Sequence, residues 1–404
     1  MSADSRILDV LARLVSFDTS SAHAQPTVEL GDFVVDRLRH DRIRCHRLDC
    51  GGGRENLWFE TGPEVDAAGR GLLLCGHTDV VPADEPEWTA DPFDLRVMET
   101  DAGPRAVGRG VCDMKGFDAI AIDLIREVAE RGTAEEPVCL LLTCDEEIGT
   151  VGAGRFVEQW GERPIPRRTI VGEPTSLRPV SGHKGHLSIS IEIGGRGCHT
   201  GFPGRGSNAV ERALPVLDAL RGLREDMTKE RTASSGLFPE TPYPVLTVAM
   251  VRAGTAINVM PDRCSLRIGA RLLPGEDADF FLPRLVEAIE AQGVSTELRP
   301  GLENPLPGTE EPLHEEACIV VPTNSTPSYA IAEDDPFLGE VRSIAGFHEP
   351  LGANFGTDAG RLVPLGCRSV IFGPGDISEA HRPDEWISVA ELLRARTLLK
   401  QMIR

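Results

Sequence analysis

Short, unbroken apolar runs that end in polar or charged residues are the feature that most constrains the fold of this chain. The runs are Gly71–Cys75, Pro137–Thr143 and Thr169–Val171, and they are followed closely by His77, Asp145 and Glu173. Runs of this length without polar alternation are typical of strands that are buried on both faces of a parallel sheet.

Helical periodicity occupies the intervals between these runs. Apolar residues recur at spacings of three and four from Ile7 to Val15, and again over Val28–Leu38, Gly116–Arg131, Gly152–Trp160 and Val389–Ile403. Further strands are expected at Asn56–Phe59 and Ser369–Gly373. Strands that alternate with helices predict an α/β fold, with a mixed, mostly parallel sheet and helices on both faces.

The pattern changes after Pro179. The expected elements are a strand at His186–Ile193, a helix at Asn208–Leu223, strands at Val245–Val251 and Cys264–Leu272, a helix at Asp277–Gln292 and a strand at Thr296–Arg299. The order β-α-β-β-α-β is that of a ferredoxin-like α+β unit. We therefore expect residues 183–298 to be a domain inserted between two parts of the α/β domain, residues 1–182 and 299–404.

Composition excludes several classes of function. The 404 residues carry a formal net charge of −21, and such a surface repels the phosphate backbone of nucleic acids. The apolar runs are far shorter than the roughly 18 residues that a membrane span needs, and no cationic, apolar leader follows Met1. We expect a cytoplasmic protein with reduced cysteines.

Histidines and carboxylates follow several of the expected strands. The candidates are His77 with Asp79, Asp113 in a glycine-rich segment, Glu146 and Glu147, Glu173, and His381. Each has a simpler interpretation by itself: a loop histidine, a helix N-cap at Asp113, or a solvated charge run. Because parallel strands end at one edge of a sheet, we expect these residues to lie together there.

Two histidines and three carboxylates without a thiolate ligand fit a hydrolytic site with two metal ions. Two cations can share one carboxylate and one water molecule, and the cations lower the pKa of that water. Zinc suits imidazole and carboxylate ligands, and cobalt or manganese would also bind such a set.

The chain resembles the di-zinc amidohydrolases that include acetylornithine deacetylases, succinyl-diaminopimelate desuccinylases, aminoacylases and glutamate carboxypeptidases. The resemblance extends over nearly the whole chain and is strongest to the acetylornithine deacetylases. It rests on Cys112–Phe117 (CDMKGF), Gly172–Leu177 (GEPTSL), His183–His186 (HKGH), Arg271–Gly275 (RLLPG) and Phe372–Glu385 (FGPGDISEAHRPDE).

The resemblance implies a role for each candidate residue. His77 and Glu173 would bind one metal, Glu147 and His381 the other, and Asp113 both. Glu146 would be the general base, Asp79 would orient His77, and the Asp113–Met114 peptide bond would be cis.

The resemblance also implies a homodimer whose inserted domain is a dimerisation or lid domain. His199 would stabilise the oxyanion in the partner's active site, and Asn258, Arg271, Gly356 and Thr357 would contact a small N-acyl amino acid. The implied reaction is hydrolysis of N2-acetyl-L-ornithine to L-ornithine and acetate, in arginine biosynthesis.

Two alternatives remain open from the sequence. A deacylase or desuccinylase of another N-acyl amino acid, or a dipeptidase or carboxypeptidase, would share the same site. Thr200–Phe202 and Phe355–Gly360 depart from the deacetylase pattern, which weakens the choice of substrate. A catalytically silent binding protein is the second alternative, but all five ligands and the base are present.

Overall fold

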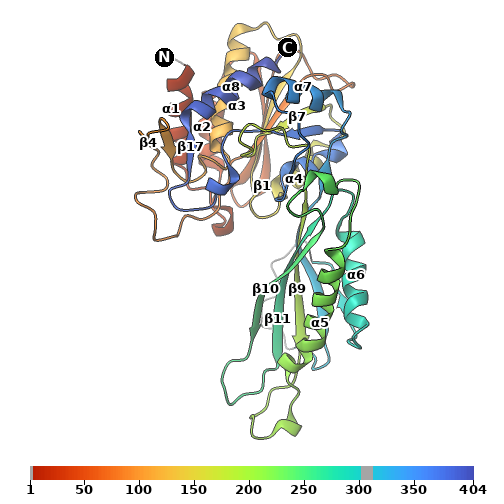
Figure 1. Cartoon of the computed structure of the whole chain (residues 1–404). Coiled ribbons are helices and arrows are strands. Elements are labelled where there is room, and N and C mark those ends of the chain that lie inside the picture. The colour runs from red at the N-terminus through yellow and green to blue at the C-terminus, as the bar shows by residue number, and fades with distance from the viewer. Residues whose placement is uncertain (1–2, 302–312) are drawn as a thin grey trace. The chain divides into compact units, whose positions relative to one another are not determined.

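The computed structural model describes residues 3–301 and 313–404, and the chain divides into two compact units (Figure 1). The first unit comprises Met1–Gly182, Ile331–Leu351 and Thr357–Arg404, and the second comprises His183–Ala330 and Gly352–Gly356. The second unit begins at the expected residue, but it continues well beyond residue 298, where the inserted domain was expected to end.

A six-stranded mixed sheet forms the centre of the first unit. Its order is β1 (Ile43–Gly51), β2 (Arg54–Thr61), β6 (Val138–Thr143), β3 (Leu72–His77), β7 (Arg168–Val171) and β16 (Arg368–Ile371). The last four strands are parallel, whereas β1 and β2 are antiparallel to their neighbours. Every residue of β3, β6 and β7 is buried. The predicted mostly parallel sheet is therefore confirmed.

Helices cover both faces of this sheet. The helices of the unit are α1 (Ala3–Val15), α2 (Val28–Arg37), α3 (Lys115–Arg131), α4 (Val151–Trp160), α7 (Pro336–Ala345) and α8 (Val389–Gln401). Trp58 in β2 stacks on Phe156 of α4, whereas Gly76 in β3 lies against Asp118 of α3. Trp58 pairs with Leu141 and Gly76 with Leu142. Because adjacent residues of a strand point to opposite faces, α3 and α4 lie on opposite sides of the sheet.

A three-stranded sheet of the same unit joins two loops that are distant in sequence. It consists of β4 (Arg96–Met98), β5 (Arg105–Val107) and β17 (Trp386–Ser388), with β5 in the middle. Val107 pairs with Trp386, and the Gly108 amide donates to the Glu385 carbonyl over 3.0 Å. The residues after β5 therefore run beside those before β17.

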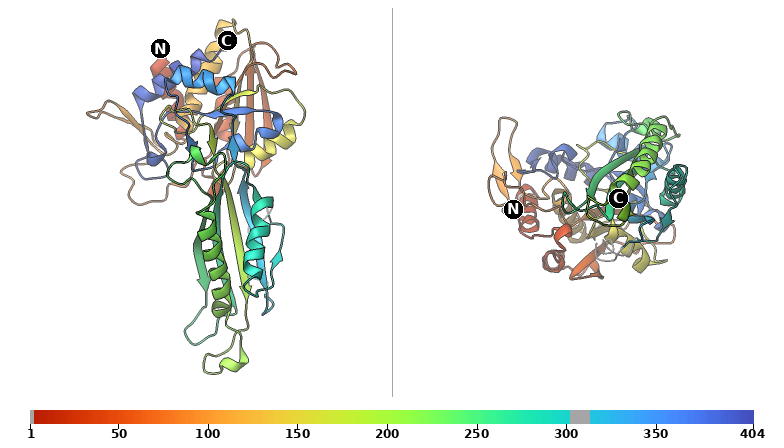
Figure 2. Two further views of the ribbon diagram at one scale, coloured as in Figure 1. Left: turned by 45° about the vertical axis from the view of Figure 1, so that its right-hand side comes forward. Right: turned by 90° about the horizontal axis from the view of Figure 1, so that it is seen from below.

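A five-stranded sheet with two helices on one face forms the second unit (Figure 2). Its order is β10 (Val245–Ala253), β11 (Arg263–Leu272), β9 (Gly185–Gly194), β13 (Cys318–Thr326) and β12 (Glu297–Leu298), and its helices are α5 (Ala209–Met227) and α6 (Ala278–Glu290). Burial alternates along β11, as expected for a sheet covered on one face. Three short strands, β8 (Gly182–His183), β14 (Tyr329–Ala330) and β15 (Gly352–Ala353), form a further sheet.

The expected closing strand of the ferredoxin-like unit was placed wrongly. The strand beside β9 is β13, which pairs antiparallel with β9 along most of its length. The expected strand at Thr296–Arg299 exists as the two-residue β12, which pairs in parallel with the outer side of β13. The second unit extends past residue 298 because β13 contributes Cys318 and Val320 to its apolar core. No helix in the described part of the chain is long and apolar enough to span a membrane.

Candidate metal centre and active site

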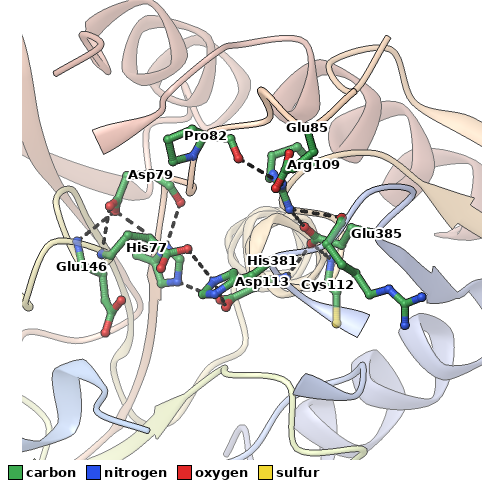
Figure 3. Close-up of polar contacts among 12 residues, drawn as sticks. His77, Asp79, Pro82, Glu85, Arg109, Cys112, Asp113, Glu146, His381 and Glu385 are labelled. Atoms are coloured by element: carbon green, nitrogen blue, oxygen red, sulfur yellow. Dashed lines mark hydrogen bonds and ion pairs between the residues drawn. The ribbon is translucent and has the colours of Figure 1, made fainter. Parts of the chain in front are cut away.

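Asp113 lies between two histidines that come from distant parts of the chain (Figure 3). Its Oδ1 is 3.0 Å from Nε2 of His77, and its Oδ2 is 3.1 Å from Nε2 of His381. His77 ends β3 and is buried, whereas the His381 side chain is 45% exposed. The carboxylate therefore presents one oxygen to each imidazole, which is the arrangement that two cations sharing a carboxylate require.

Glu147 completes a group of possible metal ligands. Its Oε1 lies 3.1 Å from His381 Nε2. One ligand atom each from His77, Asp113 and Glu147 lies within 4.8 Å of the others. Because β3 and β6 pair in parallel with His77 opposite Thr143, the residues after β6 reach the same edge of the sheet as His77.

Glu146 and Glu173 add negative charge at this edge. Glu173 follows β7, which pairs in parallel with β3, and is buried. Burial raises the pKa of Glu146 well above its usual range, and the nearby Glu173 carboxylate raises it further. Burial likewise raises the pKa of Glu173, with a further contribution from Asp113. Carboxylates crowded in this way require cations to remain ionised.

The surrounding carboxylates raise the pKa of both histidines. Burial opposes protonation of His77, but its contact with Asp113 raises its pKa well above the usual value. For His381, hydrogen bonds with Asp113 and Glu147 outweigh burial and raise the pKa to about 11. The same contacts outweigh burial at Asp113 and lower its pKa. The site is thus built to hold positive charge, and its imidazole and carboxylate donors fit divalent metal ions.

Asp79 holds the loop that carries Glu146 and Glu147. Its Oδ1 accepts from the Glu146 amide over 3.0 Å, and its Oδ2 accepts from the Glu147 amide over 3.1 Å. His77 Nδ1 lies 2.9 Å from the Asp79 main-chain oxygen and 3.6 Å from the carboxylate. Asp79 therefore orients His77 through its carbonyl group rather than its side chain, and this leaves Nε2 facing Asp113.

A buried ion pair supports the Asp113 segment, and sequence reasoning missed it. Arg109 Nη1 donates to Glu385 Oε2 over 2.9 Å, and both side chains are buried. Glu385 Oε1 accepts from the amides of Cys112 and Asp113 over 2.8 and 3.1 Å. Both residues lie in segments that the sequence had singled out, but nothing in the sequence indicates that two charged residues so far apart form a pair.

The backbone of this segment has two special features. Gly110 has a φ of +80°, which a side chain would strain. The Asp113–Met114 peptide bond is cis, as the resemblance implied. Asp113 is not a helix N-cap, because α3 is preceded by Met114 and has no side-chain cap.

The remaining candidate residues, His199, Asn258, Arg271, Gly356 and Thr357, do not belong to the group of metal ligands. In the second unit, His199 forms a β-bridge with Val259, and the Thr200 amide donates to the Asn258 carbonyl over 3.1 Å, so His199 and Asn258 lie on neighbouring segments. Arg271 in β11 pairs with His186, and Gly356 ends the unit. Thr357 belongs to the first unit, where its hydroxyl accepts from the Ala359 amide over 3.1 Å.

Comparison with known proteins identifies the class. A model of peptidase family M20/M25/M40 matches residues 73–404. Together with this match, the fold and the donor set define a metal-dependent amide hydrolase. Acetylornithine deacetylase from Erwinia tasmaniensis is 35% identical over 336 residues, covering 82% of this chain and 79% of that protein. The chain belongs to peptidase family M20/M25/M40.

Other relatives agree with this assignment. Acetylornithine deacetylase from Klebsiella pneumoniae is 35% identical over 354 residues, covering 86% of this chain and 82% of that protein. An M20 family metallo-carboxypeptidase from Sulfolobus solfataricus has a TM-score of 0.75 at 19% identity, over 99% of this chain and 98% of that one. A Staphylococcus aureus tripeptidase has a TM-score of 0.71 at 16% identity, over 100% and 98%. The solved structures show the same fold.

Proposed function

We propose that this protein deacetylates N2-acetyl-L-ornithine, releasing L-ornithine and acetate in the cytoplasm as a step of arginine biosynthesis. The choice of substrate rests on the similarity to acetylornithine deacetylases from two bacteria. Each similarity covers more than four fifths of this chain. The position of Asp113 between His77 and His381 supports a site for two metal ions.

Five side chains would hold the metal ions. His77 and Glu173 would bind one ion, Glu147 and His381 the other, and Asp113 would bind both. Two zinc ions, or cobalt ions in their place, would lower the pKa of a water molecule and polarise the amide carbonyl. The donor chemistry supports this assignment, because His77, Asp113 and Glu147 place imidazole and carboxylate donors within 4.8 Å of one another.

Glu146 would act as the general base. The Asp79 carboxylate accepts from the Glu146 amide and fixes the main chain there. The Glu146 side chain therefore extends from a fixed position at the sheet edge where His77 and Asp113 lie (Figure 3). Glu146 would accept a proton from the attacking water and deliver it to the leaving amine. Its raised pKa supports the second half of this cycle, since a carboxyl group that holds its proton can donate it later.

The second unit would complete the active site across a homodimer. We assign to His199 a role in stabilising the oxyanion of the partner's substrate, and to Asn258, Arg271, Gly356 and Thr357 contacts with substrate. The Arg271 guanidinium suits the α-carboxylate of an N-acyl amino acid, because it can donate two parallel hydrogen bonds. Size-exclusion chromatography with light scattering tests the dimer directly.

The substrate is tested by assaying the purified protein on a panel of acyl amino acids. The panel contains N2-acetyl-L-ornithine, N-acetyl-L-citrulline, N-succinyl-diaminopimelate and dipeptides, with metal analysis on the same preparation. We expect the highest kcat/KM for acetylornithine. A higher value for another compound would overturn the substrate and leave the amide hydrolase in place.

The base is tested with Glu146→Gln. We expect turnover to fall about 10²–10⁴-fold, in line with the usual contribution of general base catalysis, while the metal content stays unchanged. Glu158→Gln, an exposed glutamate on α4, is the matched control and should retain full activity. Full activity in Glu146→Gln would refute the assignment.

A further inference from the structure

A cavity of about 920 Å³ lies among helices α1, α2, α3 and α8 of the first unit, and it contains none of the residues assigned above to metal or substrate. Its volume is in the range of small-molecule sites, which is about 300–1,000 Å³. The charges of its lining residues determine which class of ligand it can bind.

The lining holds more basic than acidic residues, although the whole chain carries a net charge of −21. Six cationic residues line the cavity: Arg6, Arg37, Arg126, Arg131, Arg396 and Lys400. Four acidic residues accompany them: Asp36, Asp123, Glu127 and Glu130. The cavity therefore carries an excess of positive charge, and an anion inside it would be attracted by its walls.

Two carboxylates, the buried Asp123 and the partly buried Glu127, fix several of these cations in place. Asp123, with a side chain only 3% exposed, accepts from Arg6 Nε over 2.8 Å and from Arg396 Nε over 2.7 Å. Glu127 accepts from Lys400 Nζ over 2.7 Å and also pairs with Arg131 and Arg396. Four cations (Arg6, Arg131, Arg396 and Lys400) thus share two carboxylates, which leaves their combined charge only partly neutralised.

Arg37 differs from the other cations of the cavity. Its side chain is half-buried, and within residues 3–301 and 313–404 its guanidinium makes no hydrogen bond or ion pair. Its main-chain carbonyl accepts from Arg126 Nη1 over 3.5 Å, so the two arginines lie close together. A half-buried guanidinium without a partner is a donor available to a ligand.

We propose that this cavity binds a small anion with two or more negative charges, of the phosphorylated-metabolite class. Arg37 donates to the anion together with neighbouring guanidinium groups, and Asp123 and Glu127 hold Arg6, Arg131, Arg396 and Lys400 in position. Arginine suits this role because its planar donors match phosphate oxygens.

Isothermal titration calorimetry of the full-length protein tests the site. The probes are fructose 1,6-bisphosphate and glucose 6-phosphate, and uncharged fructose is the negative control. We expect the bisphosphate to bind with a Kd below about 1 mM and more tightly than the monophosphate, with affinity falling as salt rises. Absence of binding by both phosphates would overturn the proposal.

Two arginine variants localise the binding. Arg37→Gln should weaken bisphosphate binding by about tenfold or more, as expected for loss of a charged hydrogen bond, without lowering the melting temperature. The matched control is Arg224→Gln, which removes an exposed arginine of α5 in the second unit that does not line the cavity. Equal affinity in both variants would refute the assignment.

Hydrogen exchange with the bisphosphate separates this cavity from the metal centre. We expect added protection in α1, α2, α3 and α8. Protection confined to the loops that carry His77 and Asp113 would mean that phosphate binds at the metal centre, and the proposal would be wrong. The proposed deacetylase activity does not depend on this outcome.

Discussion

Arg109 and Glu385 form an ion pair with side chains only 1% and 0% exposed, and this pair holds the segment that presents Asp113 to both histidines. Opposite charges in a dry environment stabilise one another only while both are present. The pair therefore links the integrity of the metal centre to the stability of the first unit.

Arg109→Met should destabilise the protein strongly. Removing one partner of a buried pair typically costs about 3–5 kcal/mol, because the other charge is left without compensation. Thermal unfolding measures the effect, and Arg96→Met, which breaks a more exposed pair with Asp384, is the control. The control should cost less than about 1 kcal/mol. Equal losses in the two variants would contradict the role of the buried pair.

Asp79→Asn should weaken metal binding without unfolding the protein. The asparagine keeps one oxygen acceptor but turns an N–H donor toward the other amide of the Glu146–Glu147 loop. Changes of this kind next to metal ligands commonly cost about 10–100-fold in metal affinity, which competition with a chelator measures.

Asp49→Asn is the control for this prediction. Asp49 also accepts from a main-chain amide, that of Gly51 over 2.8 Å, but it is an exposed residue near the end of β1. Its substitution should leave the metal affinity unchanged. If both variants bind metal like the natural sequence, the Asp79 anchor does not support the site.

Metal removal should abolish activity and lower the melting temperature. A ligand that binds only the folded state stabilises it by about 2.7 kcal/mol at one hundred times its Kd. Calorimetry measures the melting temperature and a hydrolysis assay measures the activity, each before and after chelation and after zinc or cobalt is returned. Glu146→Gln should show the same thermal shift as the natural sequence, because Glu146 is assigned as base and not as ligand. A smaller shift in that variant would make Glu146 a ligand.

Acid should destabilise the second unit through His183. This side chain is fully buried; its Nδ1 donates to the Lys184 carbonyl over 3.0 Å, and its Nε2 has no partner among the described residues. Burial lowers its pKa from 6.5 to about 4. Between these values the unfolded chain binds a proton that the folded chain does not, so stability falls as pH falls from about 6.5 to 4.

His183→Asn isolates this contribution. The asparagine amide can still donate to the main chain, but it does not titrate. The loss of stability between pH 7 and pH 4 should be smaller in the variant by roughly 3 kcal/mol, the equivalent of the pKa difference. Urea unfolding at the two pH values gives the comparison, and parallel curves for the two proteins would contradict the prediction.

Unbroken apolar runs in the strands and apolar periodicity in the helices made most of the first unit predictable from the sequence. β3, β6 and β7 are fully buried runs, and their parallel pairing brings His77, Glu147 and Glu173 to one edge. β1 escaped prediction because it is an edge strand whose residues are mostly exposed and show no regular alternation of apolar and polar side chains. Such a strand is held by main-chain hydrogen bonds to β2, which leave no pattern in the side chains.

β13 escaped prediction for a different reason. Pro322 interrupts its apolar run, and proline within a run argues against a central strand. In the structure, the pairing of β13 with β9 shifts register at Pro322. The sheet therefore tolerates the absence of an N–H group on this proline. The contact between His77 Nδ1 and the Asp79 main-chain carbonyl could not be predicted either, because every residue has a main-chain carbonyl.

The anchoring of the Glu146–Glu147 loop by Asp79 has a practical consequence. Asp79 holds main-chain atoms, so the side chain at position 146 can be exchanged while the loop keeps its course. A slow Glu146 variant would then accumulate an intact substrate complex rather than a distorted one. Crystals of such a variant grown with candidate amides would show which acyl group the pocket accepts.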